Sequence, residues 1–509
     1  MEENNKRIFK NTVYLYVRQL VIMVLAFLTA RIVLEKLGVD DYGLYNVIGG
    51  FVALFTILNG VLASATRRFM ALSIGKGLQG DINGTFSTAF VMHIVIGVII
   101  VFLLETIGLF LLNSYINIPS DRYYAANLVY QFSILSIFLS ITQTPYLACV
   151  TAHERFNIYA YMSIFDVVGK LAILYLLIAI PGDKLIIYAA LLCVINFLNI
   201  FIYRLYCIRH FEECKFSLYI DKPLLFEMLK FSGWDSLGNI TTIVNAQGVT
   251  ILLNVFLTVA VNAARGLATT VSSTILSFVS GFITAAEPQL AKYYAQNEKE
   301  QFERLVFNVS QYTLFLLAIF AVPVFVELDF VLNLWLTEVP EYTSAFIKIT
   351  IIAALVQYSN QMLVKGIVAT GRVKQITTMM VPMHLFHLPL VWIVLKLGLN
   401  PTAVYWVGII PSFLALLMDL YILKKYENFP SWDFFIKILV KNLGLIAIAC
   451  IVPYLIHEQM SDGFKRFVVV CGVSVLSVIV VLWIFALNKE TREMLLCKII
   501  KKKASNVIE

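Results

Sequence analysis

The sequence predicts an all-α polytopic membrane protein with about fourteen transmembrane helices. Of its 509 residues, 60% are hydrophobic and 14% are charged, whereas about 25% charged residues is usual in soluble domains. Apolar windows of about 20 residues recur along the chain, with short polar breaks between them. Lys and Arg concentrate in every second break, which is the charge asymmetry expected of a membrane protein.

Each predicted span is an apolar window long enough to cross a bilayer as a helix. The first is roughly 40 Å long at 1.5 Å per residue, which also makes it too long for a cleaved signal peptide. An even number of spans places both termini on the same side. The predicted spans are 8–34, 43–65, 84–112, 125–148, 159–180, 185–207, 232–257, 265–286, 306–328, 343–367, 376–396, 402–423, 436–456 and 465–487.

The positive-inside rule assigns that side to the cytoplasm. The breaks EKLGVDD, NIPSDR and PGDK on the opposite side are acidic or nearly neutral. The net charge of +7 follows this topology and does not indicate a nucleic-acid partner. The basic residues of the cytoplasmic breaks include Lys6, Arg7, Lys10, Arg67, Arg68, Lys76, Arg155, Arg209, Lys215, Lys222, Lys230, Lys292, Lys299, Arg304, Arg372, Lys374, Lys424 and Lys425, and those of the tail include Lys489, Arg492 and Lys501.

The longest cytoplasmic break divides the chain into two similar parts. A shift of 223 residues places Gly43 on Gly266 and Lys76 on Lys299, and six spans on each side of the break run in the same order. This pattern predicts two six-helix lobes as parallel repeats. The predicted boundaries are 1–207 for the first lobe, 208–231 for an amphipathic connector, 232–423 for the second lobe, 424–487 for two further spans and 488–509 for a basic tail.

Arg18 is the main candidate for substrate binding. It lies roughly 15 Å from the cytoplasmic end of the first span, near the bilayer midplane. A charge in hydrocarbon costs at least about 2.5–3.5 kcal/mol, so Arg18 should face a polar cavity or an ion-pair partner that fixes helix packing. Arg31 lies near the outer end of the same span and can reach the headgroups.

The second lobe supplies the other candidate substrate-binding residues. Asp235, Asn239 and Thr242 recur at i, i+4 and i+7, which makes one polar stripe on span seven. Such a stripe lines a cavity or joins neighbouring helices by hydrogen bonds. Arg265 at the start of span eight is an interface residue or a ligand, and Lys365 in span ten reaches the headgroups or faces the cavity.

Three charged residues of the first lobe are candidates for ion coupling. Asp166 and Lys170 are four residues apart with the acid first, the favourable order for a pair within a helix. The pair either neutralises itself or acts as a switch in which protonation of Asp166 frees Lys170 for an anion. Glu105 in span three is a second buried acid for proton coupling.

Metal and cofactor chemistry finds little support in the sequence. The seven cysteines have no Cys-x-x-Cys or Cys/His ligand spacing, so we predict no disulfide, no structural metal and no cofactor. His384 and His387 lack a nearby acid, which favours packing or hydrogen bonding over metal binding. No GxxxxGK[ST] loop occurs, so an ion gradient, the membrane potential or the substrate gradient must drive any transport.

Three motifs carry a resemblance to a known family. NTVYLYVRQL, LGVDDYGLYNVIGG and RRFMALSIGKG resemble segments of bacterial polysaccharide flippases, in the polysaccharide transporter family of the multidrug/oligosaccharidyl-lipid/polysaccharide exporter superfamily. The resemblance implies a V-shaped fold of two six-helix lobes around a central cavity. It also implies an undecaprenyl-pyrophosphate-linked O-antigen or capsule repeat unit as the substrate, moved from the inner to the outer leaflet of the bacterial plasma membrane. Arg18 matches the cavity arginines of the first helix in related flippases.

A pyrophosphate-linked substrate suits these residues, because the fork of donors on arginine fits phosphate oxygens. We expect alternating access by a monomer, driven by the membrane potential or by ion antiport, with a polysaccharide polymerase and glycosyltransferases as candidate partners. The alternatives are a multidrug or cation antiporter of the same fold, which would need an acidic cavity, and a peptidoglycan-precursor flippase. A membrane-bound polysaccharide polymerase or acyltransferase is the alternative from another class, with His457 as its weak support.

Overall fold

The computed structural model describes residues 2–55, 57–75, 81–153, 155–215, 220–486 and 492. Every regular element in these ranges is a helix, so the predicted all-α class is confirmed. Eleven helical segments in the same ranges are long and apolar enough to cross a membrane, and each overlaps one predicted span. The other predicted spans, 8–34, 43–65 and 232–257, contain side chains that lie outside the described part of the chain.

The helices form two compact units. Unit 1 comprises Met1–Val271, Leu336–Phe346 and Thr377–Val407, and unit 2 comprises Ser272–Trp335, Ile347–Ile376 and Gly408–Glu509. Three long helices contribute residues to both units: α9 (Val259–Ala295), α12 (Thr343–Ala369) and α13 (Val373–Lys396). A compact unit is defined by the packing of helices in one conformation, whereas a transporter lobe is defined by the helices that move together during transport. The predicted lobe boundaries therefore stay a prediction.

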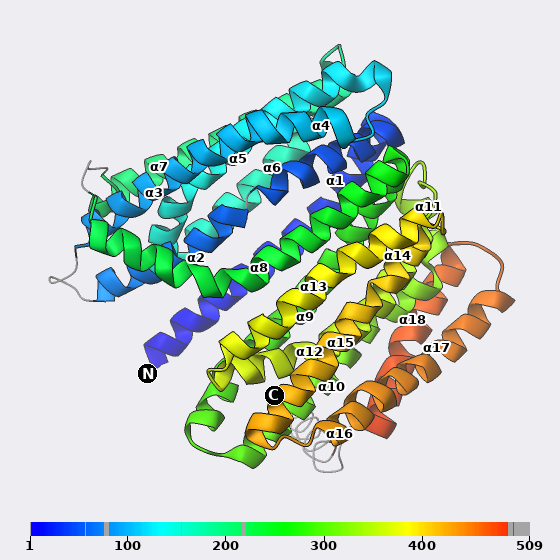
Figure 1. Ribbon diagram of the computed structural model, residues 1–509. Helices are drawn as coiled ribbons and strands as arrows, with labels where there is room; N and C mark the ends of the chain where they lie inside the picture. The colour runs from blue at the N-terminus through cyan, green and yellow to red at the C-terminus, as the bar shows by residue number, and fades with distance from the viewer. Residues whose placement is uncertain are drawn as a thin grey trace, which may run out of the picture. The chain divides into compact units, whose positions relative to one another are not determined.

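Unit 1 contains the N-terminal helices of the chain (Figure 1). Helix α5 packs against α3 and α7, α1 packs against α6, and α2 packs against α5 and α8. The elements that lie wholly in this unit are α1 (Glu2–Leu54), α2 (Ile57–Gly75), α3 (Ile82–Leu103), η2 (Leu104–Gly108), α4 (Leu109–Tyr115), η3 (Ser120–Arg122), α5 (Tyr123–Ala152), α6 (Phe156–Ala179), α7 (Lys184–His210), η4 (Glu212–Cys214), α8 (Lys222–Phe256) and α14 (Thr402–Val407).

Helix α1 is bent at the polar break that separates the first two predicted spans. Gly38 interrupts the helix with φ +81°, a conformation that side chains other than glycine rarely adopt. The predicted connector 208–231 is likewise built from distinct pieces: the end of α7, the short turn η4 and the first turns of α8. Asp221 caps α8, because its Oδ1 accepts a hydrogen bond from the Leu224 amide at 3.1 Å.

The second half of α1 forms the centre of the unit 1 core. Leu44, Val47, Ile48 and Phe51 recur at helical spacing and are at most 4% exposed. They belong to a cluster with buried residues of α3, α5 and α7. Tyr130 of α5 closes this core, since its hydroxyl donates to the Leu104 carbonyl in the π-helical turn η2 at 2.9 Å.

The close contact between α1 and α9 requires glycine at two positions. A Cβ on Gly43 would lie 2.0 Å from the Val259 carbonyl oxygen, and a Cβ on Gly266 would lie 2.8 Å from Asn46 Nδ2. Gly43 is near Ala263 and Asn46 is near Gly266, so the two helices advance in the same direction along this contact. Close approach through small residues is typical of helix packing in membranes.

Replacing Gly43 with alanine is expected to destabilise the protein by about 1–3 kcal/mol, because the new methyl group overlaps backbone that cannot move aside cheaply. Thermal unfolding of the purified protein in detergent measures the effect. Gly49→Ala is the matched control on the same helix, since nothing lies within 4 Å of its added Cβ. Equal stability of the two variants would show that the α1–α9 contact is looser than the structure has it.

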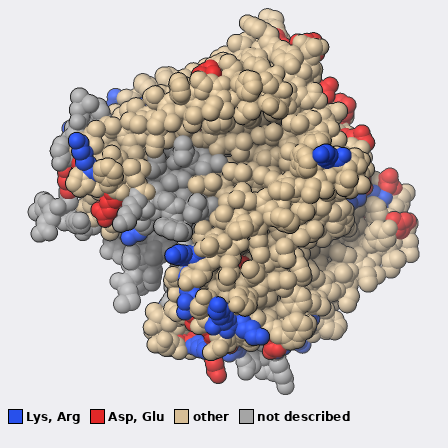
Figure 2. All heavy atoms as spheres, viewed as in Figure 1, with Lys and Arg blue, Asp and Glu red and all other residues tan. Residues whose placement is uncertain are grey.

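Unit 2 contains the C-terminal helices. Helices α10, α17 and α18 pack against one another, and α17 and α18 lie side by side in Figure 1. On the face shown in Figure 2, the charged side chains of the described residues gather at the ends of helices, and the surface that the other described residues form between them is almost wholly uncharged. The elements that lie wholly in this unit are α10 (Lys299–Val326), α11 (Leu328–Trp335), α15 (Ile409–Glu427), α16 (Ser431–Phe434), η5 (Phe435–Val440), α17 (Lys441–Gln459), α18 (Phe464–Val481) and η6 (Leu482–Ala486).

A buried ion-pair cluster fastens the last two long helices to α10. The Glu327 carboxylate, which follows α10, accepts hydrogen bonds from Arg466 Nε at 3.0 Å and Arg466 Nη2 at 3.1 Å. His457 Nδ1 lies 3.0 Å from the same carboxylate. Glu327 is 1% exposed and Arg466 is 7% exposed. This forked pairing is the geometry in which arginine binds a carboxylate most tightly.

Candidate functional site

The structure contains a polar hollow of about 300 Å³ within unit 1, enclosed by α1, α8 and α9. We call it the Arg265 hollow. Arg265 is its only charged lining residue among those that the structure describes, and no carboxylate lines it. The lining residues are Tyr45, Asn46, Gly49, Gly50, Ala246, Gln247, Thr250, Asn262, Arg265, Gly266, Thr269 and Thr270.

Hydrogen bonds to α8 and α14 hold the Arg265 guanidinium in place. Nε donates to Thr250 Oγ1 at 2.9 Å, Nη2 donates to the Ala246 carbonyl at 2.8 Å, and Nη1 lies 3.4 Å from the Tyr405 hydroxyl. The Tyr405 ring lies 5.9 Å from the guanidinium carbon. A guanidinium carries five N–H donors, so two remain without an acceptor in the described part of the chain. The hollow therefore presents an oriented cation with spare donors, which suits an anionic ligand.

A second hollow of about 410 Å³ lies on the other side of Tyr45 and Gly49, the two residues that line both hollows. We call it the Lys170 hollow. Lys170 is its charged residue, with hydroxyl and amide groups around it from α5 and α7, including Ser133, Ser136, Ser140 and Asn196. Gly49 leaves open space at this point of α1 because it has no side chain.

The Asp166–Lys170 pair forms as the spacing predicts. Lys170 Nζ donates to Asp166 Oδ2 at 2.6 Å, and both side chains stay partly exposed, at 42% for Lys170 and 29% for Asp166. The contact neutralises the pair in this conformation and still leaves Lys170 on the wall of the hollow. Its role in ion coupling stays a prediction.

The other predicted site residues are dispersed. The side chains of Arg18, Asp235 and Asn239 lie outside the described residues, although their backbones belong to α1 and α8. Thr242 is exposed on α8. Lys365 belongs to unit 2, where its Nζ lies 2.6 Å from Glu287 Oε1.

Glu105 lies apart from both hollows. It is in the π-helical turn η2 and accepts a hydrogen bond from Gln131 Nε2 at 3.2 Å. Both residues line an apolar groove of about 540 Å³ with side chains such as Phe102 and Leu135. Phe102 is 66% exposed, as a lipid-facing residue would be. The structure thus separates Glu105 from the Asp166–Lys170 pair.

The predicted hydrogen bonding is confirmed for the imidazole of His387 on α13, whereas His384 takes part through its backbone carbonyl. His387 Nδ1 lies 2.7 Å from Asn245 Oδ1, and Asn245 Nδ2 donates to the His384 carbonyl at 2.6 Å. Because Asn245 Oδ1 can only accept, His387 carries its proton on Nδ1 in this arrangement. Sequence reasoning assigned no role to Asn245.

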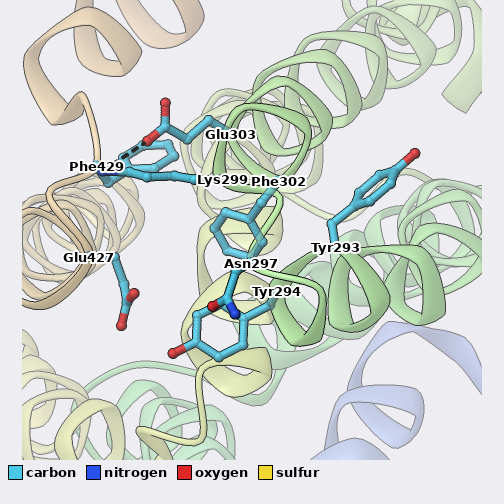
Figure 3. A pocket seen from close by; sticks show the side chains of 8 residues that line it. All are labelled: Tyr293, Tyr294, Asn297, Lys299, Phe302, Glu303, Glu427 and Phe429. Carbon is cyan, nitrogen blue, oxygen red and sulfur yellow. Dashed lines mark ion pairs between the residues drawn. The ribbon is translucent and has the colours of Figure 1, made fainter.

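Unit 2 has a pocket of about 240 Å³ at the ends of α9, α10 and α15 (Figure 3). Its charged residues pair within the chain: Lys299 with Glu303 at 3.8 Å, and Glu427 with Arg372 at 3.4 Å. Deeper in this unit, Asp419 is 1% exposed and accepts a hydrogen bond from Asn360 Nδ2 at 2.6 Å. Sequence reasoning missed Asp419, an acid within a predicted span.

Comparison with known proteins places this geometry in a family. The model of the family described as "polysaccharide biosynthesis protein" matches residues 8–294. No curated protein matches the sequence significantly.

Solved structures supply the comparison of folds. A lipid II flippase MurJ in an inward closed conformation superposes with a TM-score of 0.68 and 14% identity, covering 94% of this chain and 98% of its own. An inward-facing multidrug resistance MATE transporter gives a TM-score of 0.62 with 14% identity over 80% of this chain and 96% of its own. The Vibrio cholerae MATE transporter VcmN gives a TM-score of 0.57 with 17% identity, over 82% of this chain and 97% of its own. Because its family model spans more than half of the sequence, this chain belongs to the polysaccharide biosynthesis protein family, and it has the fold of the MurJ and MATE transporters.

Proposed function

We propose that this protein is a flippase that moves undecaprenyl-pyrophosphate-linked oligosaccharide repeat units from the inner to the outer leaflet of the bacterial plasma membrane. The observation that carries the proposal is the family match, which assigns the chain to polysaccharide biosynthesis. The fold shared with the lipid II flippase MurJ supports it. The lipid tail stays in the bilayer, and only the head group crosses.

The Arg265 hollow suits the charged part of such a head group. A pyrophosphate needs several donors held in a fixed geometry, and arginine provides them as a planar fork. Thr250 and the Ala246 carbonyl already fix the fork, so less side-chain freedom is lost on binding. Asn46 and Gln247 add amide groups suited to sugar hydroxyls.

The driving force is the membrane potential, ion antiport or both. A potential that is negative inside favours outward movement of an anion by about 2.3 kcal/mol per charge per 100 mV. The head group alternates between the two sides as the lobes rock, with Arg18, Asp235, Asn239, Thr242 and Lys365 as further substrate-binding residues. Asp166 or Glu105 takes up the counter-transported proton. The termini are cytoplasmic, and the protein works as a monomer beside a polysaccharide polymerase and glycosyltransferases.

Two alternatives follow from the fold. The likeness to MurJ favours a peptidoglycan-precursor flippase as the second candidate. The likeness to MATE proteins makes a multidrug or cation antiporter a further candidate, and such a protein would need acidic groups to hold a cation. Within the described residues the Arg265 hollow has no acid, which counts against a cation as the ligand.

Deletion of the gene tests the proposal and separates these alternatives. The deletion strain should lose surface polysaccharide and accumulate lipid-linked repeat units on the inner leaflet, measured by protection from an externally added sugar-specific probe. Peptidoglycan synthesis and drug resistance should stay normal. Normal surface polysaccharide would refute the proposal, while arrested peptidoglycan synthesis would support the second candidate instead.

Replacing Lys170 with methionine is expected to lower export about tenfold, equivalent to about 1.4 kcal/mol, because the Lys170 hollow loses its cation. The double variant Asp166→Asn/Lys170→Met keeps the helix neutral and should remain equally slow. Repeat-unit export in the deletion strain, complemented by each variant at equal expression, is the measurement. Wild-type export by the double variant would show that the pair serves helix packing alone.

A further inference from the structure

A cluster of soft metal ligands lies in unit 1, away from both hollows. Cys149 Sγ, one imidazole nitrogen of His153 and one carboxylate oxygen of Glu213 all lie within 4.8 Å of one another. The thiols of Cys207 and Cys214 lie in the same apolar cluster as Cys149, and the Cys207 thiol donates to the Tyr146 carbonyl at 3.9 Å. Three helical elements bring these residues together: Cys149 and His153 from the end of α5, Cys207 from α7, and the adjacent Glu213 and Cys214 from η4.

The surroundings hold these groups in place. Cys149, Cys207 and Cys214 are fully buried, within an apolar cluster that includes Phe86 and Tyr146. The His153 ring stacks on Phe211 with centroids 4.5 Å apart, and its Nε2 forms an ion pair with Glu213 Oε1. Cys149 Sγ lies 3.6 Å from that same oxygen. Asn83 of α3 fixes η4 from the other side, since its Nδ2 donates to the Glu213 carbonyl at 3.1 Å.

This arrangement matches what a zinc ion requires. Zn²⁺ binds Cys sulfur at about 2.3 Å and His nitrogen or carboxylate oxygen at about 2.0–2.2 Å, so tetrahedral ligand atoms lie about 3.3–3.8 Å apart. The observed separations are within reach of those values by small side-chain rotations. Cys149 and His153 are four residues apart, so both project from one face of α5. The prediction of no structural metal overlooked this Cys/His spacing. By the predicted topology the cluster is cytoplasmic, where thiols stay reduced and the combination of Cys and His indicates a metal more than a disulfide.

We propose that Cys149, His153 and Glu213 form a Zn²⁺ site, with water in the fourth position of the metal, that fastens η4 to the end of α5. Binding replaces the direct His153–Glu213 ion pair with two bonds to the metal, and it releases one proton from the His153 imidazolium and one from the Cys149 thiol. Cys207 stays beside the site as a hydrogen-bonding thiol. The site is independent of the proposed transport activity, and it anchors the chain at the point where α7 gives way to α8.

The test measures metal in the purified full-length protein. After incubation with Zn²⁺ under reducing conditions and removal of free metal, the wild-type protein should retain about one zinc ion per chain by elemental analysis. With Co²⁺ instead, a sulfur-to-cobalt charge-transfer band should appear in the near ultraviolet. Cys149→Ser should lose both signals, with retention falling about tenfold or more, since even loss of a residue that only supports a ligand costs 10- to 100-fold.

Cys193→Ser is the matched control, because Cys193 is a buried thiol on α7 that lies about 21 Å along the helix from Cys207. It should bind zinc like the wild type. Size-exclusion profiles check that each variant folds. If the Cys149→Ser variant aggregates, zinc retention is measured instead in His153→Gln, because His153 is partly exposed and its replacement disturbs the core less. Absence of retained zinc in the wild type, or equal retention by the Cys149 and Cys193 variants, would overturn the proposal. So would a count of five free thiols in the denatured protein, because a disulfide would then account for two of its seven cysteines.

Discussion

Replacing Arg265 with alanine is expected to lower repeat-unit export about 10- to 100-fold while the protein remains in the membrane. A hydrogen bond to a charged group contributes about 1.5–3 kcal/mol, and each 1.4 kcal/mol corresponds to a factor of ten. The guanidinium donates to Thr250 Oγ1 and the Ala246 carbonyl and keeps two N–H groups for a ligand. Alanine removes those donors together with the charge.

Arg265→Lys sharpens this test. Lysine keeps the charge but cannot form the fork that binds two phosphate oxygens, so its export should lie between that of wild type and of alanine. Arg209→Ala, at the exposed end of α7, is the control for a general loss of positive charge. Surface polysaccharide and inner-leaflet lipid-linked units, measured in the complemented deletion strain, give the export rate. Full export by the Arg265→Ala variant at normal expression would exclude Arg265 from substrate binding.

Hydropathy predicted the eleven membrane-length helical segments of the described ranges, because a bilayer requires about 20 apolar residues of a helix that spans it. It did not predict the boundary between the end of α1 at Leu54 and the start of α2 at Ile57, which falls inside the predicted span 43–65. Hydropathy located the breaks where a glycine or a helix cap lies. Gly38 bends α1 between the first two spans, and Asp183, within the predicted outer break PGDK, caps α7. It missed the start of α8, which begins at Lys222 within the predicted connector. That stretch alternates charged and apolar residues, so composition alone does not distinguish a surface helix from the first turns of a longer one.

The polar stripe on span seven shows how far sequence reasoning reached toward the Arg265 hollow. The stripe was followed from Asp235 through Asn239 to Thr242, yet the same helical spacing continues to Ala246 and Thr250. Those next two turns line the hollow and hold Arg265. Ala246 gives no sequence signal because it contributes its backbone carbonyl, so only the fold reveals that contact.

Ion pairs between residues far apart in the chain could not be predicted from the sequence, for a different reason. Periodicity reports which residues share one helix face, and it predicted the Asp166–Lys170 contact within α6. Arg122 of η3 instead donates to Asp41 Oδ1 at 2.8 Å and to Asp183 Oδ2 at 2.7 Å, joining α1 to the start of α7. His457, considered as weak support for an enzyme, contacts Glu327 across 130 residues of chain. In the sequence, each residue of these pairs is a single charged or polar residue near a helix end, and nothing in its neighbours identifies its partner.

Replacing Glu327 with alanine is expected to destabilise the protein by about 3–5 kcal/mol, because it removes the buried carboxylate that binds Arg466 Nε and Nη2 and leaves Arg466 with only the exposed Asp462 as a partner. The substitution removes the ion pair that joins the end of α10 to the start of α18. It also removes the contact between Glu327 and His457 of α17. Thermal unfolding and the monodisperse fraction after extraction in detergent measure the loss. Arg466→Ala should give a loss of similar size.

Two further variants decide whether the cluster acts through this buried charge pair. The double variant Glu327→Leu/Arg466→Leu removes both charges and should recover most of the stability, since apolar residues of similar volume often replace a buried pair without loss. Asp433→Asn breaks the exposed Lys437–Asp433 pair, whose atoms lie 2.8 Å apart in the same unit, and should cost at most about 1 kcal/mol. If Glu327→Ala unfolded no more readily than Asp433→Asn, the last two long helices would have to be held to α10 by apolar packing alone. The pair is therefore expected to set how firmly α17 and α18 stay attached when the rest of the protein is stressed by heat or detergent.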